Sequence, residues 1–104
     1  MDQHVYQRAV DACLERVARA LDRDESLDVL TSDGLVAIEF DDGTKYVLNR
    51  QSGASQMWFA AGARAWHYNL DESGTAWRDD RDGHDLYGRI AEVVGTKLGR
   101  PVSI

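Results

Sequence analysis

The spacing of apolar residues changes twice along this chain of 104 residues, and this change constrains the fold more than any single motif. Over Gln3–Asp22, apolar side chains recur at steps of three and four residues, which is typical of an amphipathic helix. Over Leu27–Arg78 the step becomes two, which is typical of strands. Over Leu86–Leu98 the helical step returns, and Gly99 followed by Pro101 predicts the end of that helix. The sequence therefore predicts the order helix, strands, helix.

Turn residues such as the Asp-Gly pairs divide the middle segment into short runs, so we expect about six strands. The predicted strands are Leu27–Leu30, Leu35–Phe40, Tyr46–Asn49, Gln56–Ala60, Ala65–Leu70 and Thr75–Arg78. Connections this short favour an antiparallel sheet in which each strand pairs with the next. With both helices on one face, the expected fold class is α+β, a two-layer sandwich that forms a single domain over residues 1–104.

Alternation along the strands assigns each side chain to the covered face or to the solvated face. The residues expected on the covered face are Val36, Ile38, Phe40, Tyr46, Leu48, Met57, Phe59, Trp66, Tyr68 and Trp77. Those expected on the solvated face are Val47, Asn49, Gln56, Trp58, Ala60, His67 and Asn69. An exposed Trp among amides and an imidazole is typical of a docking surface. Burial of Trp58 under a loop is the alternative.

Charge and cysteine content exclude several classes of protein. Eighteen acidic residues against 12 basic ones give a net charge of −6, which disfavours nucleic acid and anionic membranes as partners. No apolar run approaches the ~20 residues of a membrane span, and the first residues lack the pattern of a signal or transit peptide. One cysteine, Cys13, permits neither an internal disulfide nor a cysteine metal cluster. We expect a soluble protein of a reducing compartment.

Enzyme signatures are missing from the sequence. It contains no glycine-rich phosphate loop, no nucleophile elbow and no His-x-x-x-His pair. His4, His67 and His84 fall on three different predicted elements, which is typical of ordinary surface histidines. We therefore expect no catalytic activity.

Carboxylates follow the first helix and the start of the first strand. They are Asp11, Glu15, Asp22, Asp24, Glu25 and Asp28, and we refer to them as the acidic ridge. Carboxylate oxygens are hard ligands that suit Mg²⁺, Ca²⁺, Mn²⁺ and Fe³⁺, but an open ridge without Cys or His would bind such ions weakly. The alternative is a solvated acidic surface that only keeps the protein soluble. Interleaved Arg16, Arg19 and Arg23 lower the negative field.

Several residue groups at fixed spacing resemble one known family. They are Asn49–Gln51, Gln56–Ala60, Trp66–Tyr68, Trp77 and Asp82–Gly83. Together they resemble the frataxin family, in its bacterial CyaY form. The match runs through about half of the chain, and the order helix, strands, helix agrees over the rest.

This resemblance implies a non-catalytic, iron-binding protein that regulates iron–sulfur cluster assembly or supplies iron for it. The implied partners are a cysteine desulfurase and an iron–sulfur scaffold protein, in the bacterial cytoplasm. Iron, as Fe²⁺ or Fe³⁺, would be weakly bound, with other divalent cations able to take the same site. The implied state is a monomer without iron, with iron-dependent oligomerisation left open.

By position, the resemblance assigns iron to the acidic ridge: Glu15, Asp22, Asp24, Glu25, Asp28 and Asp11. It assigns partner binding to Asn49, Gln51, Gln56, Trp58 and His67. Ala18, Arg19 and Arg23 stand where relatives often carry acids, which implies a lower iron affinity here. Two rival hypotheses stay open. One is a protein-interaction module that docks through Trp58 and uses its acidic face for solubility only. The other is an iron-oxidising enzyme of ferroxidase type, which would need a preorganised cluster of His or Glu.

Overall fold

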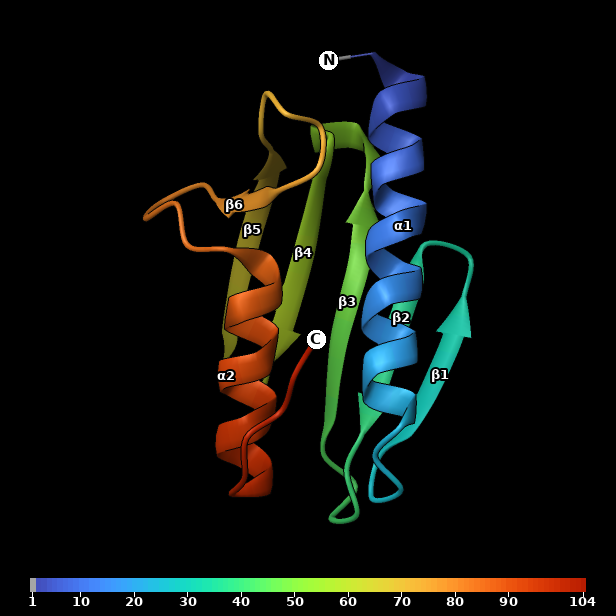
Figure 1. Cartoon of the computed structure of the whole chain (residues 1–104), viewed down its shortest axis with the longest axis vertical. Helices are drawn as coiled ribbons and strands as arrows, with labels where there is room; N and C mark the ends of the chain where they lie inside the picture. The colour runs from blue at the N-terminus through green and yellow to red at the C-terminus, as the bar shows by residue number, and fades with distance from the viewer. Residues whose placement is uncertain (1) are drawn as a thin grey trace.

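Two helices cover one face of a six-stranded antiparallel sheet in the computed structural model of the chain, which describes residues 2–104 (Figure 1). The helices are α1 (Gln3–Asp22) and α2 (Leu86–Leu98), and a short 3-10 helix, η1, spans Ser52–Ala54. The strands are β1 (Asp28–Ser32), β2 (Leu35–Glu39), β3 (Lys45–Gln51), β4 (Gln56–Ala61), β5 (Arg64–Leu70) and β6 (Trp77–Asp79). They lie in sequence order across the sheet, so the predicted two-layer α+β sandwich is confirmed.

Helix α1 begins and ends where the apolar spacing predicted. The Asp2 carboxylate caps its amino end by accepting a hydrogen bond from the His4 N–H at 2.7 Å. The side chains that it buries against the sheet are Tyr6, Val10, Cys13, Val17 and Leu21. Burial raises the pKa of the Cys13 thiol to about 12, so this cysteine is a core residue rather than a nucleophile.

The covered face of the sheet is filled by the side chains that alternation had assigned to it. Across four strands, Val36 pairs with Leu48, Leu48 with Phe59, and Phe59 with Trp66. The rings of Phe59 and Trp66 stack with their centroids 5.6 Å apart. Each of these residues lies in the core cluster or packs against it, so one row of apolar contacts runs beneath both helices.

Most strand boundaries differ from the sequence prediction by one or two residues, and two of these differences have a clear local reason. Leu27 precedes β1, because its N–H bonds to the Asp24 carbonyl in a turn while its side chain packs into the core. Thr75 precedes β6, because the Asp71 carboxylate accepts hydrogen bonds from the N–H groups of Ser73 and Ala76 and holds this stretch in a turn.

Charged side chains fix helix α2 at its start. Asp85 caps the helix by accepting a hydrogen bond from the Gly88 N–H at 2.9 Å. Arg89 is 8% exposed and lies 3.7 Å from the buried Asp79 carboxylate and 3.2 Å from that of Asp82. Its guanidinium also lies over the Trp66 ring. The helix start is thereby joined to both β5 and β6.

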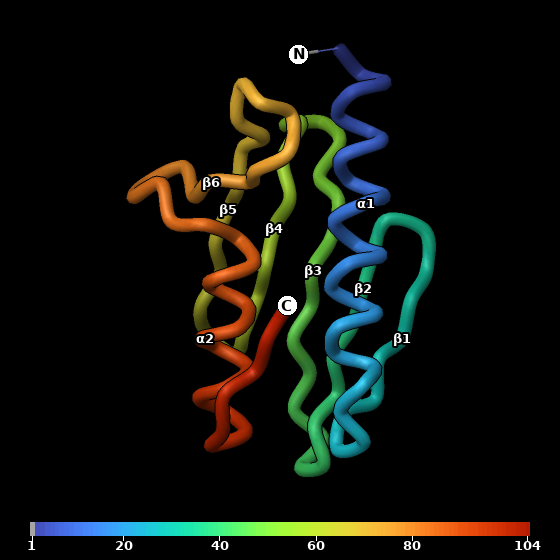
Figure 2. Tube along the Cα trace, viewed as in Figure 1, coloured from blue at the N-terminus to red at the C-terminus, as the bar shows by residue number. Residues whose placement is uncertain are grey.

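The chain after α2 turns back and runs between the two helices (Figure 2). Gly99 ends the helix in the left-handed conformation, with φ of 75°. Arg100 then pairs with Asp24 in the loop after α1, while Lys97 pairs with Asp42 in the turn between β2 and β3. Val102 and Ile104 pack against the core. The end of α2 is thus attached to the loop after α1 and to the turn between β2 and β3, which lie at the same end of the fold (Figure 1). Within residues 2–104, no helix is long and apolar enough to span a membrane.

Candidate functional site

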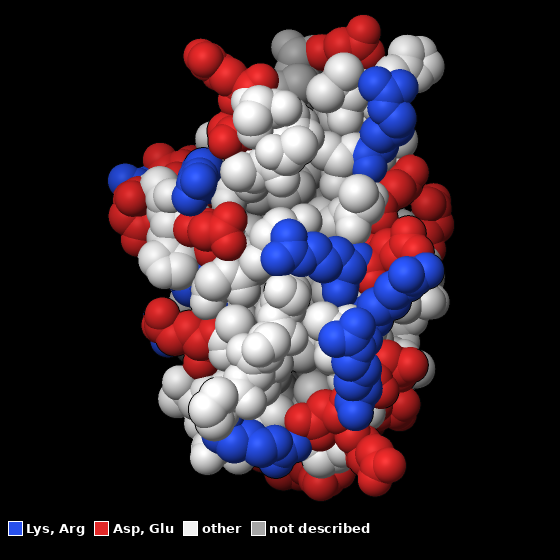
Figure 3. Space-filling model, viewed as in Figure 1, with Lys and Arg blue, Asp and Glu red and all other residues white. Residues whose placement is uncertain are grey.

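The acidic ridge follows α1 and the loop that leads into β1. Asp11, Glu15 and Asp22 are exposed along α1, Glu25 is exposed in the loop, and Asp28 is the first residue of β1. Acidic side chains line the flank of α1 that faces β1, with basic side chains beside them (Figure 3). The sequence thus supplies a negative surface beside a positive one on the same helix.

Asp24 is already engaged by other side chains. Its carboxylate accepts hydrogen bonds from the Ser26 N–H at 3.0 Å and the Ser26 hydroxyl at 2.6 Å, and it pairs with Arg100. The hydrogen bond from the Ser26 hydroxyl and the bond from Arg100 lower the pKa of Asp24 to about 2. Asp24 therefore stays ionised, and a metal ion would have to displace Arg100 to reach it.

The other ridge residues differ in how many hydrogen bonds and ion pairs their carboxylates already make. Glu15 pairs with Arg19 at 2.7 Å, and Asp11 accepts a hydrogen bond from the Gln7 amide at 3.0 Å. Within residues 2–104, no side-chain hydrogen bond or ion pair involves the carboxylates of Asp22, Glu25 or Asp28. These last three are therefore the members most available to a cation.

Asp28 stands apart from the helical part of the ridge. Its neighbour Val29 packs against the core, so alternation turns Asp28 toward the outer face of the sheet, where it is paired with Glu39. In the described part of the chain, no three His, Cys, Asp or Glu side chains converge on a point that could hold a metal ion. The ridge is an open series of carboxylates.

The outer face of the sheet carries the second candidate surface. Asn49, Trp58 and His67 are direct cross-strand neighbours on β3, β4 and β5, and Gln51 pairs with Gln56 one step along. Trp58 is half-buried rather than covered by a loop, and its ring stacks on His67 with centroids 4.2 Å apart. The Trp58 indole N–H donates to the Gln56 side-chain oxygen at 2.9 Å. Register thus brings together the five residues assigned to partner binding, which we call the sheet patch.

Two residues that the sequence-based assignment omitted extend the sheet patch. The Gln56 amide donates to the Asn69 side chain at 3.1 Å and to Asp80 at 3.5 Å. The Asp80 carboxylate also lies 3.9 Å from Nδ1 of His67. Asn69 could have been found from alternation, because it follows His67 by two residues. Asp80 could not, since it lies beyond the end of β6.

A row of apolar side chains borders the sheet patch. Cross-strand pairing connects Leu30 to Ala37, Ala37 to Val47, Val47 to Ala60, and Ala60 to Ala65. Leu30 is 46% exposed, which makes it the exposed large hydrophobic residue of the described chain. Polar and apolar rows side by side on an open sheet form a surface suited to a protein partner.

The fold places the chain among small α+β proteins in which two helices cover one face of a sheet and the other face is open. Its two candidate surfaces, the acidic ridge and the sheet patch, are both open to solvent. The family model of the frataxin-like domain matches residues 1–100. The chain belongs to the frataxin family.

Curated bacterial relatives match along nearly the whole chain. The iron–sulfur cluster assembly protein CyaY of Thioalkalivibrio sulfidiphilus is 34% identical, over 94% of this chain and 91% of the relative. The protein of the same name from Paraburkholderia phymatum is 30% identical, over 100% and 98% of the two chains. The family resemblance seen in the sequence is thereby confirmed.

Solved structures share the fold at low sequence identity. Frataxin from Psychromonas ingrahamii gives a TM-score of 0.88 at 22% identity and covers 99% of this chain and 97% of its own. Trimeric frataxin from the yeast Saccharomyces cerevisiae, solved as a ferrous complex, gives a TM-score of 0.69 at 22% identity, over 92% and 87% of the two chains. The order and layering of the elements are therefore those of frataxins.

Proposed function

We propose that this chain is a non-catalytic, iron-binding protein of iron–sulfur cluster assembly in the bacterial cytoplasm. It regulates cluster formation or supplies iron for it, and it docks on a cysteine desulfurase and its scaffold protein. The observation that carries the proposal is the pair of open surfaces, the acidic ridge and the sheet patch, on a chain whose curated relatives are iron–sulfur cluster assembly proteins. The yeast ferrous complex supports iron as the cargo.

The chemistry of the ridge fits weak, exchangeable iron binding. Its donors are carboxylate oxygens, which suit hard cations, and all of them except the half-buried Asp24 are exposed. Arg19 and Arg100 already pair with Glu15 and Asp24 and compete with a cation there. We therefore place the iron contacts chiefly at Asp22 and Glu25, with Asp28 as a separate contact.

An anaerobic Fe²⁺ titration of ¹⁵N-labelled protein tests this assignment. We expect paramagnetic broadening of amide signals centred on Asp22 and Glu25. The double variant Asp22→Asn, Glu25→Gln should lose most of this broadening. The matched control, Asp41→Asn with Glu72→Gln, removes the same charge from exposed acids elsewhere and should retain it. Equal loss in both double variants, or broadening centred elsewhere, would reject the ridge as the iron site.

Docking on the desulfurase is proposed to use charge attraction from the ridge. Opposite charges speed the encounter of two proteins, and added salt screens them. We expect affinity for the desulfurase to fall as ionic strength rises, with a shallower fall for the ridge double variant than for the matched control. A salt-independent affinity of the unmodified protein would contradict this part of the proposal.

A second candidate function rests on the sheet patch alone. The Trp58 indole is held in place by His67 and Gln56, whereas several ridge carboxylates are paired within the chain. Under this hypothesis the chain is an interaction module and its acidic surface serves solubility. The ridge double variant would then bind the desulfurase normally, while a Trp58 variant would not. Normal binding by both variants would reject docking on the desulfurase through either surface.

A further inference from the structure

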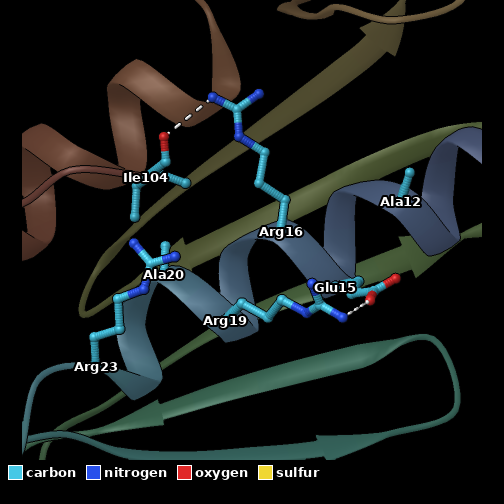
Figure 4. A pocket seen from close by; sticks show the side chains of 7 residues that line it. All are labelled: Ala12, Glu15, Arg16, Arg19, Ala20, Arg23 and Ile104. Carbon is cyan, nitrogen blue, oxygen red and sulfur yellow. Dashed lines mark hydrogen bonds and ion pairs between the residues drawn. The ribbon is translucent and has the colours of Figure 1, made fainter.

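A groove lies between α1 and the segment that follows α2 (Figure 4). Its volume is about 490 Å³, within the range of ~300–1,000 Å³ that is typical of small-molecule sites. The residues that line it are Ala12, Glu15, Arg16, Arg19, Ala20, Arg23 and Ile104.

The side chains that line this groove carry a net positive charge, whereas the protein as a whole is negative. Three guanidinium groups line it against one carboxylate, in a chain whose net charge is −6. That carboxylate, Glu15, is paired with Arg19. Among residues 2–104, no ion pair includes Arg16 or Arg23. Two arginine side chains thus face the groove without an acidic side chain as partner, and basic side chains cover this part of α1 in Figure 3.

Arg16 is held in position before any ligand arrives. Its guanidinium lies 3.9 Å from the centroid of the Tyr87 ring, and one Nη donates to the Ile104 carbonyl at 3.1 Å. A guanidinium carries five N–H donors, so most of its donors stay available. Arg23 extends over Ala20 toward the same side of the groove (Figure 4). A preorganised donor loses less side-chain entropy on binding than a mobile one.

We propose that this groove binds a small organic anion with two or more carboxylate or phosphate groups. Arg16 and Arg23 would each donate a pair of hydrogen bonds to one anionic group, since the guanidinium fork matches the geometry of carboxylates and phosphates. Ala12, Ala20 and Ile104 would contact the carbon skeleton between those groups. This site requires no iron, and it shares one residue, Glu15, with the acidic ridge.

Arginine side-chain NMR of the intact protein, with citrate and pyrophosphate as separate probes, tests the proposal. We expect at least one probe to cause saturable shifts of the Nε–H signals of Arg16 and Arg23 and of the amides of residues 102–104. Saturation by citrate identifies a carboxylate ligand, and saturation by pyrophosphate a phosphate ligand. Sodium chloride at matched ionic strength should cause no such shifts. Lack of saturation below about 10 mM with both probes would overturn the proposal.

A pair of charge-matched variants separates a built site from general attraction. Arg23→Gln removes a guanidinium that lines the groove, whereas Arg8→Gln removes one from the same helix outside it. We expect Arg23→Gln to weaken probe binding about tenfold and Arg8→Gln less than about twofold. Both arginines are exposed, and unchanged circular dichroism would confirm that both variants fold. Equal weakening would show attraction by net charge alone and would overturn the site. If Arg23→Gln fails to fold, Arg16→Gln makes the same comparison, because Arg16 is the other proposed donor and is also exposed.

Discussion

The Trp58 indole and the His67 imidazole stack across β4 and β5, with an angle of 18° between their planes. Gln56 holds the indole N–H from the same strand, and the Asp80 carboxylate flanks the imidazole. An aromatic side chain that is fixed before binding contributes contact area at a small cost in entropy. The stack and the hydrogen bond therefore hold the Trp58 ring in position on the sheet patch.

Replacing Trp58 should therefore weaken partner binding without unfolding the protein. We expect Trp58→Ala to reduce affinity for the desulfurase complex by about 2 kcal/mol, the size of an interface hot spot. Calorimetric titration measures the affinity, and thermal unfolding checks the fold. Trp58→Phe keeps a ring on His67 but loses the hydrogen bond to Gln56, so we expect an intermediate affinity. Unchanged affinity in Trp58→Ala would remove the sheet patch from the docking surface.

Acid should destabilise the fold through Asp24. Its folded-state pKa of about 2 lies below the ~3.9 of an unfolded Asp, so the ionised carboxylate stabilises the folded state. This contribution is complete above about pH 4 and disappears as the pH falls toward about 2. We expect Asp24→Asn to flatten the dependence of the unfolding free energy on pH across this window.

Asp22→Asn is the matched control for that experiment. It removes a carboxylate two residues away that has no side-chain partner within residues 2–104, so its acid dependence should follow that of the unmodified protein. Urea unfolding at several pH values measures both variants. Identical profiles for the two variants would show that the Arg100 and Ser26 contacts do not stabilise the fold.

Replacing Arg89 should lower the unfolding free energy more than replacing any other charged residue. Arg89→Met leaves the Asp79 carboxylate, only 6% exposed, without its cationic partner. Loss of one partner from a buried ion pair costs about 3 kcal/mol or more. Urea unfolding should show this loss, while Arg81→Met at an exposed position should change the unfolding free energy by less than about 0.5 kcal/mol. A small effect of Arg89→Met would indicate that Asp79 is satisfied by the Arg81 N–H alone.

Gly34 in the turn between β1 and β2 should be sensitive to any side chain. Its φ is 72°, and a Cβ there would lie 2.8 Å from Cζ of Arg50, the partner of Asp33. Gly83 has a similar φ of 73° with open space around it. We expect Gly83→Ala to cost about 1 kcal/mol of unfolding free energy and Gly34→Ala about 2 kcal/mol. Equal costs would show that Arg50 moves aside freely.

The spacing of apolar residues was sufficient to predict the fold, because the spacing within each helix or strand depends on which of its sides is buried. Helix α1 was predicted with its observed bounds, and the covered face of the sheet was predicted residue by residue. The register followed from short turns, so Trp58 and His67 were expected to share a face. These features depend on neighbours close in sequence, where spacing carries the information.

Contacts between distant segments could not be predicted in this way. Asp24 belongs to the acidic ridge by sequence, yet its partner Arg100 lies 76 residues away. Asp79 lies close to Asp80 and Asp82 in the sequence, but α2 brings Arg89 against it and buries both. The arginine groove likewise depends on where Ile104 returns to α1. A single sequence holds no periodic signal for such pairings.

The sequential order of the six strands has a consequence for how the chain reaches its native state. Each hairpin closes a loop of only a few residues, so the entropic barrier to forming the sheet is low. Helix α1 contacts β1 and β2, whereas helix α2 comes from the far end of the chain. We therefore expect the central hairpins to form first and the helices to dock afterwards. Kinetic measurements on variants should accordingly show that Leu48→Ala slows refolding, whereas Val93→Ala mainly speeds unfolding.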